Sequence, residues 1–251
     1  MSCVNIRGYR IGEGRPKVIL PIVERTEAAI LEKAAQFSTL LADCVEWRAD
    51  WFEGFQSPAA IARCVQKLRV ALRDKLLLVT FRTKAEGGKQ ALSHKEYLAF
   101  LHLILDTDCA DLLDIEFFTA GADLPKLVEQ AHSAGVAVVC SSHDFAKTPP
   151  RAELVCRMVQ MQQAGADLPK LAVMPRCRSD VLELLASTAE MADLHSETPV
   201  ITMSMGALGA VSRLAGETFG SAMTFANPGQ ASAPGQVSLD IVNEVLDALH
   251  L

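Results

Sequence analysis

Two lysines lie within identical octapeptides of this 251-residue chain, and either one could act as a nucleophile. The sequence AGADLPKL occurs at residues 120–127, where it contains Lys126, and again at residues 164–171, where it contains Lys170. An unprotonated lysine amine can attack a carbonyl compound and form a Schiff base. Which lysine suits that chemistry depends on the segments that flank each copy.

The two copies are expected in different secondary structures. The first leads into LVEQAHSAG, so Asp123 is suited to a helix N-cap and Pro125 to the first helical turn. Lys126 is then expected on an exposed helical turn. The second copy follows a helical pattern that Gly165 is suited to end, and it leads into the β-rich LAVMP, which places Lys170 in a strand.

A lysine inside a strand of a parallel sheet lies in surroundings that disfavour its charge. Burial favours the neutral amine, which is the form that attacks a carbonyl. Two alternatives for Lys170 stay open from this residue alone. It could pair with a structural carboxylate, or it could begin the strand in solvent.

Polar residues at a spacing of two recur in three other expected strands. This spacing puts both members on one face of a strand. At the carboxyl ends of barrel strands, such residues face the mouth where active sites are built. The pairs are Glu46 and Arg48, Thr80 and Arg82, and Asp114 and Glu116. For the last pair, a structural ion pair is an equal alternative.

Three residues outside the expected strands add candidates for proton transfer and anion binding. His143 follows the fifth strand, and histidine is the side chain best matched to proton transfer near neutral pH. Glu86 lies beside two glycines in the loop after the third strand, where a carboxylate could orient the histidine ring, although a solvated loop acid fits equally. Arg213 opens the helix after the seventh strand and suits bidentate recognition of a carboxylate.

Short apolar runs alternate with segments of helical spacing along the whole chain. Strands are predicted at residues 17–22, 44–49, 76–82, 112–117, 136–141, 169–174, 200–205 and 221–225. Helices are predicted at residues 26–39, 58–72, 94–106, 124–134, 152–164, 179–191, 211–217 and 238–249. About eight βα units in a chain of this length predict a single (β/α)8 TIM barrel domain over residues 1–251. A doubly wound sheet is the structural alternative.

The segment before the first barrel strand contains three glycines that favour turns. They are Gly8, Gly12 and Gly14. We therefore expect a short N-terminal hairpin that closes one end of the barrel.

Composition excludes several classes of function. The net charge of -6 and the absence of a basic run argue against nucleic-acid binding and favour a small-molecule ligand. The seven cysteines form no CxxC pair and fit reduced thiols. We see no secretory h-region or membrane span, no metal-binding spacing of histidines and no dinucleotide fingerprint. We therefore expect a cytoplasmic protein without membrane contact, a metal or a dinucleotide cofactor.

Two late segments could line a ligand site. Met203 and Met205 share a strand face and are either ordinary core residues or an apolar wall beside the ligand. The loop NPGQASAPGQ is either a plain connection or a lid that supplies Ser232 and Gln236 to a polar ligand.

Seven ordered motifs at the expected strand ends resemble the type I 3-dehydroquinate dehydratase family over nearly the whole chain. They are EWRAD (46–50), TFRTKAEGG (80–88), SSHDF (141–145), GADLPKLAVMP (165–175), ITMSMG (201–206), SRLAGETFGSAMTF (212–225) and ASAPGQ (231–236). The resemblance implies dehydration of 3-dehydroquinate in the shikimate pathway, which serves aromatic amino acid biosynthesis, by a cytoplasmic homodimer.

The resemblance also implies roles for individual residues. Lys170 matches the Schiff-base lysine, His143 the proton-transfer residue and Glu86 the acid that supports this histidine. Positions that hold the hydroxyls and carboxylate of the substrate are matched by Glu46, Arg48, Arg82, Arg213, Ser232 and Gln236. The apolar walls are matched by Met203, Met205 and Phe225.

Two departures and two alternatives accompany the resemblance. Pro21 stands where some relatives have serine, which removes a hydroxyl contact, and Gly206 and Ala207 stand where others have a polar or basic pair. A class I aldolase that cleaves a keto acid would use the same Schiff base. A barrel that binds a shikimate-like acid without turnover is the non-enzymatic alternative.

Overall fold

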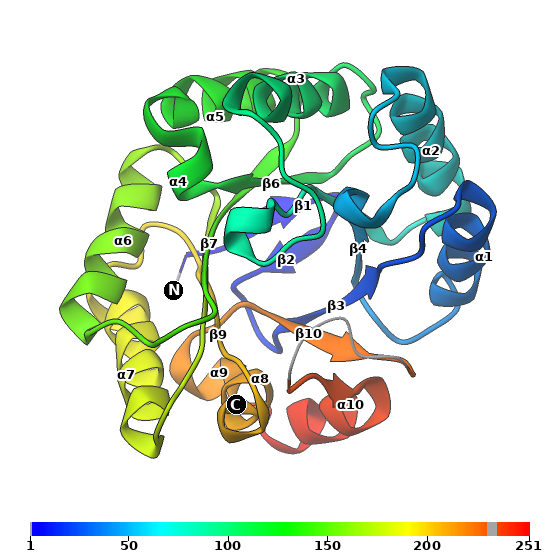
Figure 1. Ribbon diagram of the computed structural model, residues 1–251. Coiled ribbons are helices and arrows are strands. Elements are labelled where there is room, and N and C mark those ends of the chain that lie inside the picture. Colours follow the sequence, from blue (N-terminus) through cyan, green and yellow to red (C-terminus); the bar gives the residue numbers. More distant parts are fainter. Residues whose placement is uncertain (1, 230–234) are drawn as a thin grey trace.

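The predicted TIM barrel is confirmed in the computed structural model, which describes residues 2–229 and 235–251. Nine strands of these residues form one parallel sheet that curls into a barrel with helices outside (Figure 1). The strands are β3 (Lys17–Ile22), β4 (Cys44–Arg48), β5 (Leu76–Thr80), β6 (Leu112–Glu116), β7 (Ala137–Asp144), β8 (Leu168–Val173), β9 (Ile201–Ser204), β10 (Met223–Asn227) and β11 (Val237–Ser238).

The barrel closes through β10, which contacts a different strand on each of its two sides. Strands β3 to β9 pair in chain order, and β10 pairs with β3 through three residue pairs. Between β9 and β10 the structure has a bridge from Val200 to Ser221, where the Ala222 amide donates to the Val200 carbonyl at 2.8 Å. The short β11 adds to the far end of β10.

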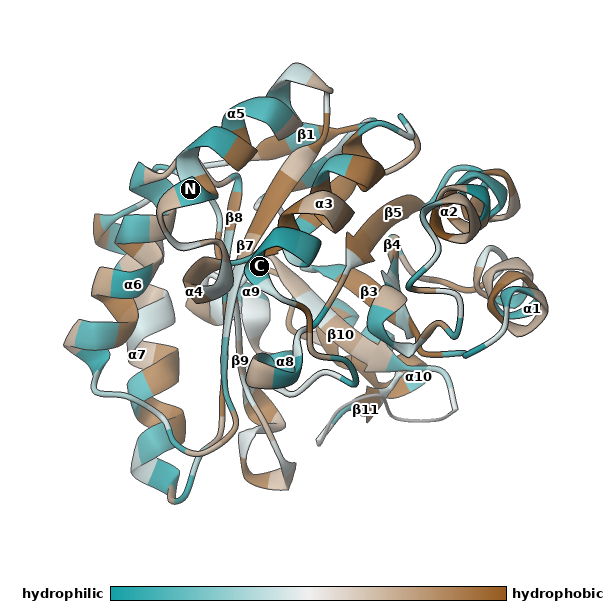
Figure 2. Cartoon of the chain, turned by 45° about the horizontal axis from the view of Figure 1, so that its top comes forward, coloured by the Kyte–Doolittle hydropathy of each residue, from teal (hydrophilic) through white to brown (hydrophobic). Residues whose placement is uncertain are grey.

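The described residues contain ten α-helices and four 3-10 helices. The α-helices are α1 (Glu27–Phe37), α2 (Pro58–Leu72), α3 (His94–Leu105), α4 (Phe117–Ala120), α5 (Leu124–Ser133), α6 (Arg151–Gln163), α7 (Arg178–Leu194), α8 (Val211–Leu214), α9 (Gly216–Phe219) and α10 (Leu239–Ala248). The 3-10 helices are η1 (Ala49–Trp51), η2 (Lys84–Glu86), η3 (Gly121–Asp123) and η4 (Ala207–Gly209). Brown apolar strands and helix faces meet between the two layers (Figure 2).

Alternation along each strand divides the core into two clusters. In β8, Leu171 and Val173 pack toward the helices, whereas Ala172 belongs to the cluster inside the barrel. Lys170 has the same parity as Ala172, so its side chain points into the barrel. The exposed fraction of Lys170 is 3%, which excludes the alternative that it begins the strand in solvent.

The predicted N-terminal hairpin is present. Strands β1 (Val4–Ile6) and β2 (Tyr9–Ile11) pair antiparallel around Arg7 and Gly8, which both have positive φ, as a two-residue hairpin turn requires. Ile6 and Ile11 pack in the inner cluster with residues that begin barrel strands, such as Leu76 and Leu112. The hairpin therefore covers the amino-terminal end of the barrel and leaves the carboxyl end for a ligand.

Several predicted boundaries are wrong in instructive ways. Most strands differ by one to three residues, but β7 continues to Asp144, so His143 lies inside the strand and not beyond it. The predicted helix at 211–217 is divided at Ala215 into α8 and α9. Asp123 holds the predicted N-cap position of α5 and Pro125 lies in its first turn, but the Asp123 side chain makes no capping hydrogen bond, because η3 leads into the helix in helical geometry. Its carboxylate instead contacts His94 at 2.8 Å.

Candidate active site

Lys170 lies at the centre of the barrel mouth among buried carboxylates. Its Nζ donates to Oδ2 of Asp114 at 3.3 Å and lies 3.9 Å from Oε1 of Glu46. The ammonium also lies 4.8 Å from the centroid of the Phe225 ring. The two lysines of the repeated octapeptide therefore lie in different surroundings. Lys126 is exposed on α5, whereas Lys170 is buried inside the barrel.

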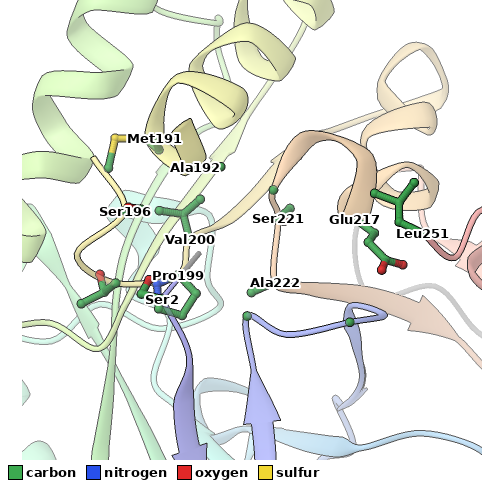
Figure 3. A pocket seen from close by; sticks show the side chains of 14 residues that line it. Ser2, Met191, Ala192, Ser196, Pro199, Val200, Glu217, Ser221, Ala222 and Leu251 are labelled. Carbon is green, nitrogen blue, oxygen red and sulfur yellow. The ribbon is translucent and has the colours of Figure 1, made fainter. Parts of the chain in front are cut away.

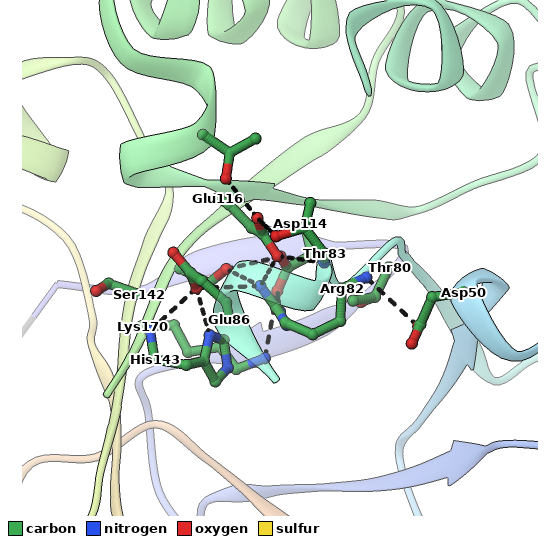
Figure 4. A network of polar contacts seen from close by, with 12 residues as sticks. Asp50, Thr80, Arg82, Thr83, Glu86, Asp114, Glu116, Ser142, His143 and Lys170 are labelled. Atoms are coloured by element: carbon green, nitrogen blue, oxygen red, sulfur yellow. Dashed lines mark hydrogen bonds and ion pairs between the residues drawn. The ribbon is translucent and has the colours of Figure 1, made fainter. Parts of the chain in front are cut away.

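Arg82 binds Asp114, the carboxylate that accepts from this lysine, and the neighbouring Glu116 (Figure 4). Its Nη2 donates to Asp114 at 2.8 Å, and its Nη1 donates to Glu116 at 3.0 Å and to the Ser141 hydroxyl at 2.9 Å. Although burial alone would raise the pKa of Asp114, the positive charges of Arg82 and Lys170 hold it below its ordinary value. Asp114 is therefore an anion placed between two cations.

Glu116 has mainly structural contacts. Its carboxylate accepts hydrogen bonds from the Thr83 amide and hydroxyl, both at 2.8 Å, and from the Thr119 hydroxyl at 2.6 Å. Its backbone amide donates to the Tyr97 hydroxyl at 2.8 Å. These contacts attach the end of β5 to β6. The structural alternative for Asp114 and Glu116 thus holds for Glu116, while Asp114 faces the lysine.

His143 and Glu86 form a close pair beside Lys170. Nδ1 of His143 lies 2.8 Å from Oε2 of Glu86, and the same oxygen accepts the His143 backbone amide at 3.0 Å. Burial, with the positive charges of Arg82, Lys170 and Arg48, holds the pKa of the His143 imidazole well below its ordinary value. This shift favours the neutral imidazole, which is the form that a general base needs.

Glu86 is unusual for a carboxylate close to cations. Burial raises its pKa to about 8, against the opposing charge of Arg82. One of its two oxygens, Oε1, is buried without a hydrogen-bond partner in the described residues. Because Glu86 contacts Nδ1, the other ring nitrogen of His143 is the one available to a ligand.

Lys170, His143 and Glu86 line one cavity of about 320 Å³ at the carboxyl ends of the strands. This volume suits a small organic molecule. Its other lining residues are Glu46, Arg48, Trp51, Arg82, Gly87, Lys89, Phe145, Ala172, Met203, Met205, Arg213, Phe225 and Gln236. Eleven of the twelve predicted site residues are therefore brought together, and Ser232 lies outside the described residues.

Five lining residues were not predicted. Ala172 could have been found from the strand alternation with Lys170, and Phe145 from its place in SSHDF. Trp51, Gly87 and Lys89 follow the ends of β4 and β5, but the sequence alone does not show that η1 and the β5 loop fold over the mouth.

Arg48 is held at the rim of the cavity by Asp50. Its Nε and Nη2 donate to the two oxygens of Asp50 at 2.7 and 2.9 Å. Asp50 has no exposed surface, and it also accepts the Lys89 amide at 3.0 Å. One buried carboxylate thus fixes both an arginine side chain and the backbone of a neighbouring loop.

Arg213 is the buried cation on the opposite side of the cavity. Its exposed fraction is 2%, and burial lowers the pKa of its guanidinium to about 10. Nη1 of Arg213 lies 3.6 Å from the sulfur of Met203. The Thr224 hydroxyl donates to the backbone carbonyl of Arg213 at 2.8 Å. This desolvated guanidinium is suited to bind a carboxylate ligand.

The two departures in the sequence have distinct geometric settings. Pro21 is opposite Glu46 in the β3–β4 register and is not among the lining residues. Gly206 has a φ of 70°. Its backbone lies so close to Gly235 that a Cβ atom on Gly235 would be 2.2 Å from the Gly206 carbonyl oxygen. This contact brings the segment that contains Gln236 to the end of β9.

A second cavity lies at the opposite end of the barrel, where β9 and β10 begin (Figure 3). It has a volume of about 120 Å³ and is lined by residues such as Ser2, Pro199, Val200 and Ser221. Glu217 is the one acidic or basic side chain in its described lining, and it pairs with His250. This cavity lacks the nucleophile and the base that the first contains.

Two further findings concern the described residues as a whole. No group of three or more histidine, cysteine, aspartate or glutamate side chains in residues 2–229 and 235–251 is arranged to hold a metal ion. Within the same ranges, no helix has the length and apolar character needed to cross a bilayer.

The fold and the first cavity define a (β/α)8 barrel of the enzyme type, with a buried lysine and a histidine–carboxylate pair at the carboxyl ends of the strands. The family model described as type I 3-dehydroquinase matches residues 18–251. The chain belongs to the type I 3-dehydroquinase family.

Known proteins of this family are similar to the chain over its full length. The 3-dehydroquinate dehydratase of Bacillus subtilis is 46% identical over 250 residues, which are 100% of this chain and 98% of the relative. A crystal structure of the type I enzyme from Clostridium difficile with covalently modified comenic acid has a TM-score of 0.96 and 41% identity, and covers 99% of this chain and 98% of that one. The enzyme from Enterococcus faecalis has a TM-score of 0.93 and 40% identity, over 99% and 100% of the two chains.

Proposed function

We propose that this protein is a hydro-lyase that converts 3-dehydroquinate to 3-dehydroshikimate in the shikimate pathway, through a Schiff base on Lys170 and a syn elimination of water. One observation supports the mechanism: the buried Lys170 amine shares a cavity with the imidazole of His143, whose Nδ1 atom contacts Glu86. Membership of the dehydratase family supports the choice of substrate.

The Lys170 ammonium first releases a proton, and the neutral amine attacks the C3 ketone to form a carbinolamine. The carbinolamine hydroxyl takes up a proton and leaves as water, which gives an iminium ion on Lys170. The iminium withdraws electrons and acidifies the C2 hydrogen, which His143 removes to leave an enamine. The C1 hydroxyl then departs with the proton that His143 now carries, and the electron pair of the enamine forms the new double bond. Water hydrolyses the resulting iminium and releases the product from Lys170.

The surrounding residues are proposed to hold the substrate at its two ends. Arg213, with Gln236 and Ser232 from the last loop, binds the carboxylate, and Glu46, Arg48 and Arg82 bind hydroxyl groups. Met203, Met205 and Phe225 form the apolar wall. Because the Arg82 guanidinium already binds Asp114 and Glu116, its charge is shared between these anions and the substrate. The elimination needs no metal or organic cofactor, since the iminium supplies the electron sink.

Borohydride trapping tests the covalent step. The protein is mixed with 3-dehydroquinate, reduced, digested and analysed by peptide mass spectrometry. We expect an adduct on the peptide that contains Lys170, and none in the Lys170→Ala variant. The matched control is Lys126→Ala, because Lys126 lies in the other copy of the octapeptide and is exposed on the surface. A folded, ligand-binding protein without an adduct on Lys170 would refute the mechanism.

The two alternatives make different products. A class I aldolase would cleave a carbon–carbon bond of a keto acid, and a binding protein would release the acid unchanged. Both would leave 3-dehydroshikimate undetected when the reaction is followed by its conjugated enone absorption.

The homodimer and the cytoplasmic location stay predictions. Light scattering of the purified protein at several concentrations tests the dimer, for which a molecular mass near twice 27.1 kDa is expected. Cell fractionation tests the location.

A further inference from the structure

A lysine that the proposed mechanism does not use lies at the rim of the active-site cavity. Lys89 lines the cavity, and its Nζ lies 4.2 Å from the centroid of the Trp51 ring. Its side chain is exposed, and no carboxylate of residues 2–229 and 235–251 forms an ion pair with it. Its charge is therefore directed to an aromatic face and to the solvent at the mouth.

The position of Lys89 is fixed by the same buried carboxylate that holds Arg48. The backbone amide of Lys89 donates to Oδ2 of Asp50 at 3.0 Å, and Trp51 follows Asp50 directly in η1. The aromatic platform and the lysine thus come from two loops that Asp50 joins. This arrangement holds the ammonium at the entrance although the side chain itself is exposed.

Other cations near this side of the cavity are compensated. Arg48 forms a two-pronged ion pair with Asp50, and Arg82 is bound by Asp114 and Glu116. The chain as a whole carries a net charge of -6, which repels an approaching anion. A cation at the entrance without a carboxylate partner is the group that offsets this repulsion.

We propose that Lys89, held on the face of Trp51, is a further substrate-binding residue that attracts the carboxylate-bearing substrate into the cavity before it reaches Arg213. This inference rests on the proposed function, because it concerns the same anionic substrate. Lys89 contributes to capture of the free substrate and not to the steps that follow imine formation. Its effect therefore belongs to kcat/KM, and it weakens as salt screens the charge.

The matched control is Lys84 in the same loop. Lys84 is exposed, begins η2 and does not line the cavity. Lys89→Gln and Lys84→Gln change the net charge of the protein equally, as do Lys89→Glu and Lys84→Glu. A difference between the two positions therefore reports the place of the charge and not its amount.

Steady-state kinetics with 3-dehydroquinate at ionic strengths from about 0.01 M to about 0.5 M provides the test, since the screening length changes severalfold over this range. At low salt we expect kcat/KM to fall about threefold in Lys89→Gln and about tenfold in Lys89→Glu, with kcat almost unchanged. At high salt the differences should nearly vanish. Equal losses in the Lys84 variants, or a loss in kcat alone, would overturn the proposal.

A double-mutant cycle tests the role of Trp51. In the background of Trp51→Leu, which keeps an apolar side chain but removes the aromatic face, Lys89→Gln should cost less than in the native protein. If the losses in kcat/KM of the two single variants simply added in the double variant, Trp51 would not position Lys89. Active wild-type protein with unaltered Lys89 variants would refute this inference alone, whereas absence of imine and turnover in the wild type would refute the proposed function together with it.

Discussion

Nζ of Lys170 and Nη2 of Arg82 donate to the same oxygen of Asp114, at 3.3 and 2.8 Å. The other oxygen of Asp114 accepts the Ser141 hydroxyl at 2.7 Å. Asp114 has no exposed surface, so its charge is compensated entirely by these neighbours. The nucleophile is thus positioned by a carboxylate that the arginine holds in its ionised form.

Replacement of Asp114 by asparagine should destabilise the fold strongly. The change leaves Lys170 and Arg82 as buried cations with less compensation, and removal of one partner from a buried ion pair costs about 3 to 5 kcal/mol. We expect this loss in the free energy of unfolding from urea titrations at neutral pH. The exposed acid Asp193 offers a control, since Asp193→Asn should change that energy by less than about 0.5 kcal/mol. Equal stability of the two variants would contradict the ion-pair argument.

The His143→Ala variant should separate imine formation from turnover. Proton transfer by a positioned side chain contributes about 10² to 10⁴-fold to rate, so kcat should fall by such a factor. Lys170 keeps its environment, and the borohydride adduct should therefore still form. Near-normal turnover of His143→Ala would show that another group moves the proton.

The Glu86→Gln variant should be more stable than the native protein at alkaline pH. The pKa of Glu86 rises on folding from its ordinary value of 4.5 to about 8, so ionisation opposes folding above about pH 4.5. Glutamine removes this cost, and its benefit should grow between about pH 4.5 and pH 8 to a few kcal/mol.

Thermal unfolding of Glu86→Gln at pH 4.5 and pH 8 measures this difference. Glu197→Gln is the control, since Glu197 is exposed. Activity of Glu86→Gln should fall, because an amide compensates the imidazolium form of His143 less well than a carboxylate. A variant equally stable relative to the native protein at both pH values would show that Glu86 ionises normally in the folded state.

Replacement of Arg213 by alanine should mainly weaken substrate binding. A carboxylate would bind this guanidinium both before and during the reaction, so its removal raises KM more than it lowers kcat. We expect KM to rise by about 10²-fold, as for loss of a charge-assisted bidentate contact. A loss confined to kcat, measured under saturating substrate, would exclude this role.

The sequence predicted the site better than the limits of its elements. Strand alternation predicted that Glu46 and Arg82 face the mouth of the barrel. For Lys170 it allowed two faces and did not choose between them. The prediction that His143 follows the strand was wrong, because β7 extends to Asp144. Its last residues are polar and resemble a loop, but they pair with β8. Such tertiary pairing has no local signal.

The loops over the mouth were the least predictable part. Trp51 and Lys89 are brought together by Asp50, which bonds to backbone amides from a distant loop. Asp123 was placed correctly at the N-cap position of α5, but its residue type does not show that the preceding η3 leaves it without a capping hydrogen bond.

The closure between β9 and β10 has a consequence for the motions of the barrel. Six residue pairs join β7 to β8, whereas the described residues at the closure between β9 and β10 form the isolated Val200–Ser221 bridge and a hydrogen bond from the Thr202 amide to the Ser221 hydroxyl. Local opening with the lowest free energy should follow this seam, and amide protons beside it should exchange with solvent before those of β7 and β8. Because Phe225 lies in β10 on one side of this seam and Lys170 in β8 on the other, a substrate in contact with both would oppose its opening.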